Sequence, residues 1–286
     1  MTGAHAQMLP DAQRLHLQHG PSDLIVWAVQ SRQQAYPAAT KRFETIISEI
    51  VEELDELRQR ISPLSPPPLG EVAMRMHEAC FPFAQDHALT RMAAVAGGVA
   101  DEVLSALVAH SDPKRAYVNN GGDIALYLAP QRSFKTSMRT LEGAELGVIK
   151  IRAEDGIGGI ATSGRQGRSL SRGIADSVTV LAKTAAEADV AATLIANAVD
   201  LPNHPSIIRK AARDVQEHSD LGELPVVVAC GPLTEAESAR ALEVGLECAK
   251  NFQLKGLITS AALFLNGQSA TTGAKYMKVN RELCHV

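Results

Sequence analysis

The spacing of apolar residues divides the chain into strand-like and helix-like segments. Residues 23–31 form a short run rich in β-branched and aromatic side chains, and residues 39–61 follow it with apolar positions at helical spacing. These positions are Phe43, Ile46, Ile47, Ile50, Leu54, Leu57 and Ile61. The pattern predicts a strand and then an amphipathic helix. The proline-rich residues 62–69 end that helix, because proline lacks an amide donor and fixes φ.

Small residues dominate two later segments that are helical by pattern. The centre of residues 90–110 consists of Ala, Val and Gly, and residues 185–200 are rich in alanine. Gly97 and Gly98 each disfavour a helix by ~1 kcal/mol relative to alanine. We therefore expect a close neighbour on this face, which could be a strand, another helix or a ligand, and packing alone is the preferred explanation.

The remaining pattern mixes strands and helices without a regular βαβ period. Strands are predicted at 146–155, 177–184, 225–230 and 256–265, and the apolar run 225–230 is typical of a buried strand. Thr234 and Glu237 form a capping box at the start of a helix. Asn266-Gly267 predicts a hairpin turn. This mixture favours an α+β fold over a doubly wound sheet. We expect a single domain over residues 1–286, with residues 1–22 as a polar and flexible leader.

Composition and charge limit the kinds of molecule that the chain is expected to bind. The formal net charge is −4 and the pI is near 6.1, so the chain has no basic footprint for nucleic acid or an anionic membrane. A small molecule or a protein is the expected partner. The N-terminus resembles no signal peptide, and no apolar run reaches the ~18 residues that span a bilayer. We expect a cytoplasmic protein.

The cysteines agree with that expectation. Cys80, Cys230, Cys248 and Cys284 are scattered, and no two of them form a CxxC pair. This spacing fits neither a structural zinc site nor a disulfide framework, so reduced thiols are expected.

The first patch that could carry chemistry is Asn119-Asn120-Gly121-Gly122-Asp123, between two strand-like runs. Asn and Gly tolerate positive φ and can expose a row of amides to an anion or a carbonyl group. A type I′ hairpin turn explains the same residues without any ligand.

The second patch is residues 156–180, in which four glycines precede Arg165. It also contains Thr162, Ser163, Arg168 and Arg172. Glycine amides, hydroxyls and guanidinium groups together suit a phosphate or pyrophosphate, although the segment is neither a Walker loop nor a GxGxxG motif. A mobile surface loop is an equally good interpretation.

The third patch is Asp189 and Thr193, which are four residues apart and share one face of a predicted helix. A carboxylate and a hydroxyl at this spacing can hold Mg²⁺, which takes only one or two protein carboxylates in addition to substrate phosphates. A dipole-stabilised acid and a threonine bonded to its own helix explain the spacing equally well.

The same residues give little support to a serine hydrolase. Ser163 lies in Thr-Ser-Gly instead of GxSxG, and only the fold could bring a base to it. The possible bases are His87, His204 and His218. A metallohydrolase is disfavoured because the chain has no HExxH motif.

Taken in order, the patches resemble the ApbE superfamily of FAD-dependent protein flavin transferases. The ordered set comprises Asn120-Gly121-Gly122-Asp123, Ala161-Thr162-Ser163-Gly164, Ser177-Val178-Thr179-Val180 and Ala188-Asp189-x-x-Ala192-Thr193. The chain is more similar to an uncharacterised branch of that superfamily, over most of the segment from Met92 to past Val228. The resemblance implies a compact T-fold-related domain with a mixed, mainly antiparallel sheet and packed helices.

The resemblance also implies ligands and roles. FAD would lie across the glycine-rich patches, and the FMN phosphoryl group would pass to a protein threonine with AMP as the leaving group. Asp189 and Thr193 would hold Mg²⁺, and Thr162, Ser163 and Arg168 would contact phosphate or substrate. The nucleotide side would be lined by Asn120, Gly121, Gly122, Asp123, Gly97, Gly98 and Gly164. Similarity to the superfamily and the small-residue faces also imply a homodimer.

Two departures from the transferase pattern and one partial match leave other functions open. Ala96-Gly97-Gly98 lacks the lysine of the Ala-Lys-Gly motif, and residues 165–175 replace an Ile-Asp-Pro-x-Thr-Gly loop. The segment 269–275 resembles an acceptor motif around Thr272 but ends in Lys275. The alternatives are a diverged cytoplasmic enzyme, such as a hydrolase that acts on a small metabolite without FAD, and a non-catalytic binding protein that dimerises through the helix around Gly97.

Overall fold

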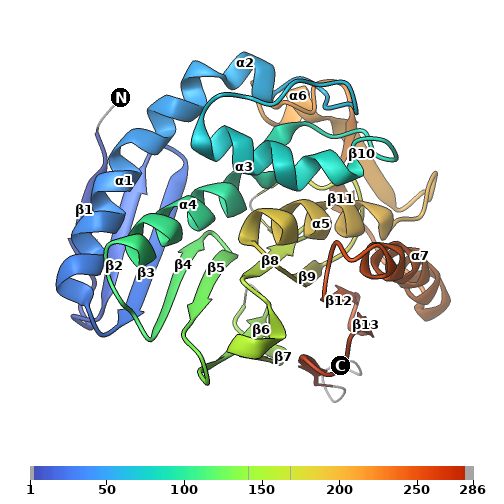
Figure 1. Cartoon of the computed structure of the whole chain (residues 1–286). Coiled ribbons are helices and arrows are strands. Elements are labelled where there is room, and N and C mark those ends of the chain that lie inside the picture. Colours follow the sequence, from blue (N-terminus) through green and yellow to red (C-terminus); the bar gives the residue numbers. More distant parts are fainter. Residues whose placement is uncertain (1–2, 141, 168, 281–286) are drawn as a thin grey trace. The chain divides into compact units, whose positions relative to one another are not determined.

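The computed structural model describes residues 3–140, 142–167 and 169–280 (Figure 1). These residues fall into two compact units. Unit 1 comprises the residues up to 134 together with 152–161 and 182–190, and unit 2 comprises 135–151, 162–181 and the residues from 191 on. The expectation of a single domain stays a prediction, and the two units are described separately below.

Unit 1 is built on antiparallel strands in the order β1-β2-β3-β4-β5-β8. Their bounds are β1 (His5–Met8), β2 (Arg14–His19), β3 (Ser22–Val29), β4 (Arg115–Asn120), β5 (Asp123–Leu128) and β8 (Gly159–Ser163). Side chains alternate between the two faces, so Leu24, Val26 and Ala28 of β3 are completely buried while their neighbours are partly exposed. One face of these strands therefore carries the core of unit 1.

The N-terminal segment corrects one prediction. Residues 1–22 were expected to be a flexible polar leader, but β1 and β2 form an antiparallel hairpin within them. Leu15 and Leu17 of β2 are buried, and β2 pairs with β3 along its full length. The alternation of Leu15 and Leu17 with polar residues is the period-two signal of a half-buried strand, which the polar composition obscured.

The helices of unit 1 are α1 (Arg32–Glu52), α2 (Leu54–Leu57), α3 (Glu71–Cys80) and α4 (Val95–Ala109), with short 3₁₀ turns η1 (Phe81–Phe83) and η2 (Arg91–Ala94). Helix α1 begins seven residues before the predicted start, and Pro37 lies inside it. Its predicted apolar face is confirmed, because Phe43, Ile46 and Ile50 are buried. Helix α1 packs on β2 and β3, and α4 packs on β4 and β5 (Figure 1).

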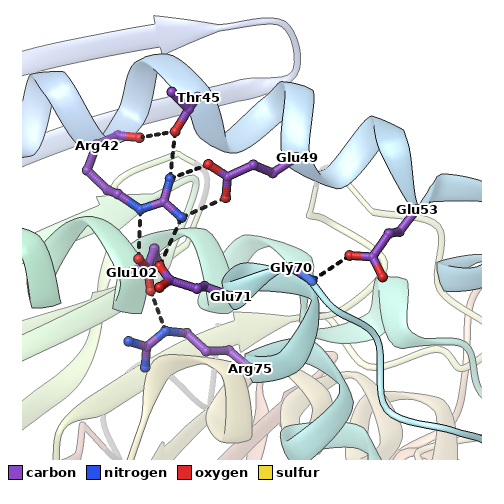
Figure 2. Close-up of polar contacts among 8 residues, drawn as sticks. All are labelled: Arg42, Thr45, Glu49, Glu53, Gly70, Glu71, Arg75 and Glu102. Carbon is purple, nitrogen blue, oxygen red and sulfur yellow. Dashed lines mark hydrogen bonds and ion pairs between the residues drawn. The ribbon is translucent and has the colours of Figure 1, made fainter.

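A buried carboxylate ties the helices of unit 1 together (Figure 2). Glu102 of α4 is 5% exposed and accepts hydrogen bonds from Nε of Arg42 at 2.7 Å and Nε of Arg75 at 2.6 Å. The Arg42 guanidinium also donates to both carboxylate oxygens of Glu49, at 2.7 Å each. Both oxygens of Glu102 therefore have a cationic partner, which is the condition for burying a charge without a large penalty.

Helix α4 is apolar for most of its length. In the described part of the chain, residues Arg91–Ala109 form one stretch long and apolar enough to cross a membrane, and half of it is buried inside the structure. The stretch packs against α1, α3, β4 and β5. Its composition is therefore that of a core helix of unit 1.

Unit 2 contains three groups of antiparallel strands. One group is β9 (Ser177–Ala182), β12 (Ser260–Leu265) and β13 (Gln268–Thr272); another is β6 (Ser133–Arg139), β7 (Glu145–Arg152) and β14 (Met277–Val279); the third is the pair β10 (Ile207–Ala211) and β11 (Pro225–Cys230). The helices are α6 (Ala212–Val215), α7 (Glu235–Leu254) and the part of α5 (Ala185–Ala198) from residue 191 on, whereas the start of α5 and the short turn η3 (Ala153–Asp155) belong to unit 1. Helix α7 packs on β12 and β13.

Several local predictions for unit 2 are confirmed and one is wrong. Helix α7 begins with the predicted capping box of Thr234 and Glu237, and Asn266 and Gly267 turn the chain between β12 and β13 with positive φ. Residues 225–230 do form a strand, β11, but it is not buried: Val226 is buried, whereas Val228 is 40% exposed. Strand β11 pairs only with β10 within the described residues, and Val228 and Ala229 of β11 are exposed.

Every strand pairing described above is antiparallel, and helices and strands are mixed along the chain. The prediction of an α+β fold with a mainly antiparallel sheet is confirmed.

Candidate functional site

Three residues that the sequence marked as site candidates meet at the first turn of α4 in unit 1. Nδ2 of Asn120 donates to the carbonyl of Ala96 at 3.1 Å, and Oδ1 of Asn120 accepts from the amide of Asp23 at 3.4 Å. The amide of Gly97 donates to Oδ2 of Asp189 at 3.0 Å. The end of β4, the start of α4 and helix α5 therefore share one cluster, which we call the α4 cluster (Asn120, Ala96, Gly97 and Asp189).

The close neighbour expected at Gly97 is the start of α5. A Cβ atom at Gly97 would lie 2.3 Å from the carbonyl oxygen of Ala185 and 2.6 Å from the amide nitrogen of Ala186. At Gly98 the nearest atom would be Cγ of Met76, at 3.2 Å. The preferred explanation, packing of another helix, therefore accounts for Gly97. The face of α4 that was considered for dimerisation is filled at this point by α5 of the same chain.

The two helices cap each other. Asp101 of α4 accepts hydrogen bonds from the amides of Ala185 at 3.0 Å and Ala186 at 2.8 Å, which are the first two residues of α5. Asp189 of α5 accepts in return from the first turn of α4. Carboxylates at helix N-termini satisfy unpaired amides and interact favourably with the helix dipole. This reciprocal capping fixes the position of the Asp189 side chain.

Both capping acids have raised pKa values. Burial raises the pKa of Asp189 to about 7, and the charge of Asp101 acts in the same direction, while the amides of Gly97 and Ala96 oppose it. Burial also raises the pKa of Asp101 to about 6, against the amides of Ala186 and Ala185. Asp189 as a residue is partly exposed, and its Oδ2 is held in place by the Gly97 amide. Perturbed carboxyl groups of this kind are candidates for functional sites.

The turn between β4 and β5 is a two-residue hairpin. Asn120 pairs with Asp123, and Gly121 and Gly122 have φ values of 67° and 120°. Oδ1 of Asn119 accepts from the amide of Gly122 at 2.9 Å, and a Cβ atom at Gly122 would meet nothing within 4 Å. The hairpin interpretation of this patch therefore agrees with the structure, and the Gly122 backbone borders open space.

A magnesium ion fits this donor set only in part. In the described part of the chain no group of three or more His, Cys, Asp or Glu side chains could hold a metal ion. Asp189 offers one carboxylate whose Oδ2 already accepts from Gly97. That fits a Mg²⁺ ion whose remaining ligands are phosphate oxygens and water. Thr193 lies four positions further along α5, and the assignment of Asp189 and Thr193 to a metal stays a prediction.

In unit 2 the predicted hydroxyl residues lie at the end of β8. Oγ1 of Thr162 and Oγ1 of Thr179 are 2.9 Å apart, and Thr179 is buried. Gly164 follows with φ of 141°, where a Cβ atom would lie 2.6 Å from the carbonyl oxygen of Asp176. Gly164 is therefore required for the chain to enter the loop that follows. The proposed ligand contacts of Thr162, Ser163 and Gly164 stay predictions.

The loop of residues 164–176 is held by Asp176. Its Oδ1 accepts from Nη2 of Arg165 at 2.5 Å and from Nε2 of Gln166 at 3.2 Å, and its Oδ2 accepts from the amide of Asn266 at 2.6 Å. Nε of Arg172 is buried without a hydrogen-bond partner in the part of the chain that the structure describes. Arg168, which was predicted to contact phosphate, lies outside the described residues.

The histidines considered as catalytic bases have other partners. Nε2 of His204 lies 3.0 Å from Oε1 of Glu237, and its Nδ1 accepts from the amide of Ser206 at 3.2 Å. His218 lies beside Glu217 at the surface, and His87 contacts the ring of Phe83. Both ring nitrogens of His204 are thus used, which gives no support to a serine hydrolase built on Ser163.

The possible acceptor Thr272 is buried in β13. Its hydroxyl accepts from the amide of Ala261 at 3.1 Å, and its exposed fraction is 6%. A hydroxyl in this position cannot meet a bulky flavin nucleotide unless β13 separates from β12.

Sequence reasoning missed two acids that organise these regions. Asp101 lies one turn after Gly97 on the same face of α4, and this i, i+4 spacing could have identified it as the partner of whatever approaches Gly97. Asp176 follows the loop directly, but the contact with Asn266 spans 90 residues, and no local pattern indicates such a contact.

Comparison with known proteins identifies the family. The model of the family described as AbpE bacteria matches residues 6–271. The chain belongs to this family. The match covers nearly the whole chain, so the resemblance to the ApbE superfamily inferred from the ordered motifs is confirmed.

Curated relatives carry the family name UPF0280. The chain is 34% identical over 160 residues to a UPF0280 protein of Methanopyrus kandleri, an alignment that covers 55% of this chain and 62% of the relative. It is 41% identical over 113 residues to a UPF0280 protein of Methanococcus vannielii, which covers 37% of this chain and 44% of the relative. The chain thus aligns with less than two thirds of the length of these relatives.

Solved structures agree on the fold. The flavinyl transferase ApbE of Pseudomonas stutzeri, in its apo form, aligns with 95% of this chain and 95% of its own, with a TM-score of 0.50 and 14% sequence identity. At this identity the likeness shows the fold alone. This member of the family therefore has an ApbE-like fold, and its activity has to be argued from its own residues.

Proposed function

We propose that this member of the AbpE family is an enzyme that binds a flavin nucleotide or a closely related nucleotide. The observation that carries the proposal is the α4 cluster. Three motif residues from distant parts of the sequence, Asn120, Gly97 and Asp189, converge on one helix start. The open space beside the Gly122 backbone suits a ligand that lies close to the β4–β5 turn.

In this proposal each residue of the α4 cluster has a defined task. Asn120 joins β4 to α4 through Ala96 and so holds the turn in place. Asp189 presents a carboxylate oriented by the Gly97 amide. When bound, Mg²⁺ would supply positive charge that neutralises phosphate oxygens. Asp189 would be its protein ligand in unit 1. The resemblance implies that Thr193 assists it and that Thr162 and Ser163 contact phosphate or substrate, and these three residues belong to unit 2.

The carboxylate of Asp189 determines how a nucleotide can approach. Its Oδ2 already accepts from the Gly97 amide at the anion-attracting start of α4, so a bare phosphate would meet this acid there and would be repelled once the acid is ionised, above its raised pKa of about 7. We therefore expect nucleotide binding to depend on a divalent cation. FMN transfer to a protein threonine, with release of AMP, is the reaction that the resemblance implies for such a complex.

Thermal shift and flavin fluorescence measurements test this proposal directly. FAD with Mg²⁺ should raise the melting temperature of the wild-type chain, whereas FAD with EDTA should not. Asp189→Asn should abolish the Mg²⁺-dependent part of this rise in melting temperature. Asp214→Asn, which changes an exposed acid of α6, is the charge-matched control and should behave as the wild type. Absence of FAD binding at millimolar ligand with Mg²⁺ would refute the proposal.

Unit 2 favours a second candidate, a diverged enzyme that acts on a small anionic metabolite without FAD. The supporting observation is the buried Nε of Arg172, which has no partner among the described residues. A guanidinium with a free donor suits a carboxylate or a phosphate, although the charge of Asp200 already acts on Arg172. A thermal shift screen of small acids without nucleotide separates the two candidates, because stabilisation lost in Arg172→Gln would support this one.

A further inference from the structure

The loop between α2 and α3 of unit 1 exposes a contiguous group of apolar side chains. Leu64 and Leu69 are each 94% exposed, which makes them the two most exposed large apolar side chains in the part of the chain that the structure describes. Three consecutive prolines, residues 66–68, lie between them. Single exposed leucines are common at protein surfaces, but a contiguous apolar group indicates an interaction site.

The prolines favour a polyproline II conformation for this segment. Each proline fixes its own φ at about −65°, and each residue before a proline is kept out of the helical region. Gly70, which follows, has φ of −69° and ψ of 144°, which are polyproline II values, and the chain then enters α3. We call residues 65–69 the proline ridge.

The burial of the proline ridge repeats every three residues. A polyproline II helix has three residues per turn, so residues three apart share an edge. Pro68 is buried and Ser65 is partly buried, which identifies their edge as the one that faces unit 1. Pro66 and Leu69 share the second edge, Pro67 lies on the third, and all three are exposed. The ridge therefore presents two apolar side chains about 9 Å apart on one edge.

Two side chains hold the backbone of the ridge. Nη2 of Arg91, a residue that is only 1% exposed, donates to the carbonyl of Pro66 at 2.7 Å. The carboxylate of Glu53 accepts from the amide of Leu69 at 2.8 Å and from the amide of Gly70 at 2.7 Å (Figure 2). These bonds leave the side chains of the ridge available to a partner. A segment that is fixed in advance loses little entropy when it binds.

Free positive charge precedes the ridge. Arg58 and Arg60 are exposed, and no ion pair joins either of them to an acid among the described residues. A complementary surface therefore needs acidic side chains at this end of the ridge. An anionic lipid surface also attracts arginines, but it requires no particular backbone conformation. A groove that reads residues three apart requires the conformation that is fixed here.

We propose that the proline ridge docks into a groove of a partner protein that is lined by aromatic rings and bordered by acidic side chains. The rings receive the edge of Pro66 and Leu69, which is the general way in which proline-rich segments are recognised. The acidic side chains pair with Arg58 and Arg60. This surface shares no residue with the α4 cluster, so the inference is independent of the proposed nucleotide site.

Titration of isolated domains that bind polyproline II segments tests the partner chemistry. The probes are a WW domain, an SH3 domain and an EVH1 domain, each labelled with ¹⁵N and followed by its amide chemical shifts. We expect at least one of them to bind the full chain, about fivefold more tightly than it binds a free peptide of residues 57–71, because only the peptide has to be ordered. Absence of binding to all three domains at millimolar concentration would overturn the proposal.

Variants of the exposed edge test the location. Leu69→Ser and Pro66→Ala should each weaken binding of that domain about tenfold. Both keep the backbone groups that Glu53 and Arg91 hold, so the melting temperature should not change. Leu254→Ser is the matched control, because this leucine at the end of α7 is 88% exposed, and it should leave the affinity unchanged. Equal weakening in the edge variants and the control would overturn the proposal.

A charge variant tests the acidic border. Arg58→Gln with Arg60→Gln should weaken binding several-fold and reduce its dependence on salt. The control, Arg240→Gln with Lys250→Gln, removes the same charge from exposed positions of α7 and should have no effect. Unchanged affinity in the first variant would contradict the proposed pairing.

Two further measurements separate this partner from other occupants of the ridge. Sedimentation with vesicles of equal parts phosphatidylcholine and phosphatidylglycerol should show no binding of the full chain. Vesicle binding that Leu69→Ser abolishes would overturn the proposal in favour of a lipid surface. Self-association in analytical ultracentrifugation that the same variant abolishes would overturn it in favour of a second copy of this chain.

Discussion

The α4 cluster of unit 1 and the loop 164–176 of unit 2 are held in different ways. In the α4 cluster, carboxylates bond to backbone amides: Asp101 to Ala185 and Ala186, and Asp189 to Gly97. In the loop, Asp176 holds the Arg165 and Gln166 side chains. The first arrangement consists of bonds to the amides at the starts of two helices, whereas the second combines the Asn266 amide with two long side chains that can change rotamer. We infer that the α4 cluster is the more rigid of the two regions.

The largest expected effect comes from Gly97. Gly97→Ala should destabilise the chain by about 3 kcal/mol, because its Cβ would enter the backbone of α5, and overpacking outweighs the higher helix propensity of alanine. Gly98→Ala is the matched control, since its only close contact would be with the flexible Met76 side chain, with Val72 at an ordinary 3.9 Å, and it should be nearly neutral. Urea denaturation measures both. Similar losses in the two variants would contradict the backbone contact.

Asp101 should make the free energy of unfolding depend on pH. Burial raises its pKa to about 6 from an ordinary value of 3.8, so the folded chain holds more protons than the unfolded chain between these values. This stabilising contribution is complete below pH ~4 and is lost as the pH rises through ~6, a change of about 3 kcal/mol. Asp101→Asn should flatten this part of the stability–pH curve. A wild-type curve without a decline in this window would contradict the raised pKa.

Removing the acid that holds the loop should have the next largest effect. Asp176→Ala should cost about 2 kcal/mol, since the loop loses bonds from Arg165, Gln166 and the Asn266 amide. The destabilisation by Asp176→Ala should be smaller at high salt. Salt screens the ion pair with Arg165 in the wild type, because both partners are partly exposed. Asp214→Ala, at an exposed ion pair of α6, should cost far less in the same urea series.

The smallest effect is expected at the hydroxyl pair of unit 2. Thr162→Val should cost about 1 kcal/mol, because the buried hydroxyl of Thr179 loses its partner. Ser163→Ala, at the neighbouring position, should change the free energy of unfolding by less than about half of that amount. If both variants behave alike, the Thr162–Thr179 bond does not contribute to holding the end of β8.

The sequence predicted local structure correctly where a local pattern has a single physical cause. The capping box at Thr234, the turn at Asn266-Gly267 and the apolar face of α1 follow from contacts a few residues apart, and all three are confirmed. The glycines at 97 and 98 indicated a close neighbour, but no local pattern could name α5, which begins 88 residues after Gly97.

The errors have equally specific causes. Strand β2 was missed because only Leu15 and Leu17 are apolar in a polar stretch, although two alternating buried residues and full pairing with β3 suffice for a strand. Strand β11 was predicted to be buried because its residues are apolar, yet burial depends on whether another layer covers the strand. For the site, the sequence named Asn120, Gly97 and Asp189 separately, and only the structure showed that they meet.

The reciprocal capping of α4 and α5 also constrains the order in which the chain can fold. The Gly97 amide precedes its acceptor Asp189 by 92 residues, and Asp101 precedes the Ala185 amide by 84. During synthesis α4 therefore leaves the ribosome before Asp189, the acceptor for its Gly97 amide, has been made. That amide lacks this partner until α5 has also emerged. Contacts between such distant residues form late, because closing a long loop costs entropy before any bond is gained. The nascent chain should thus acquire its candidate site in one step, when the second helix arrives.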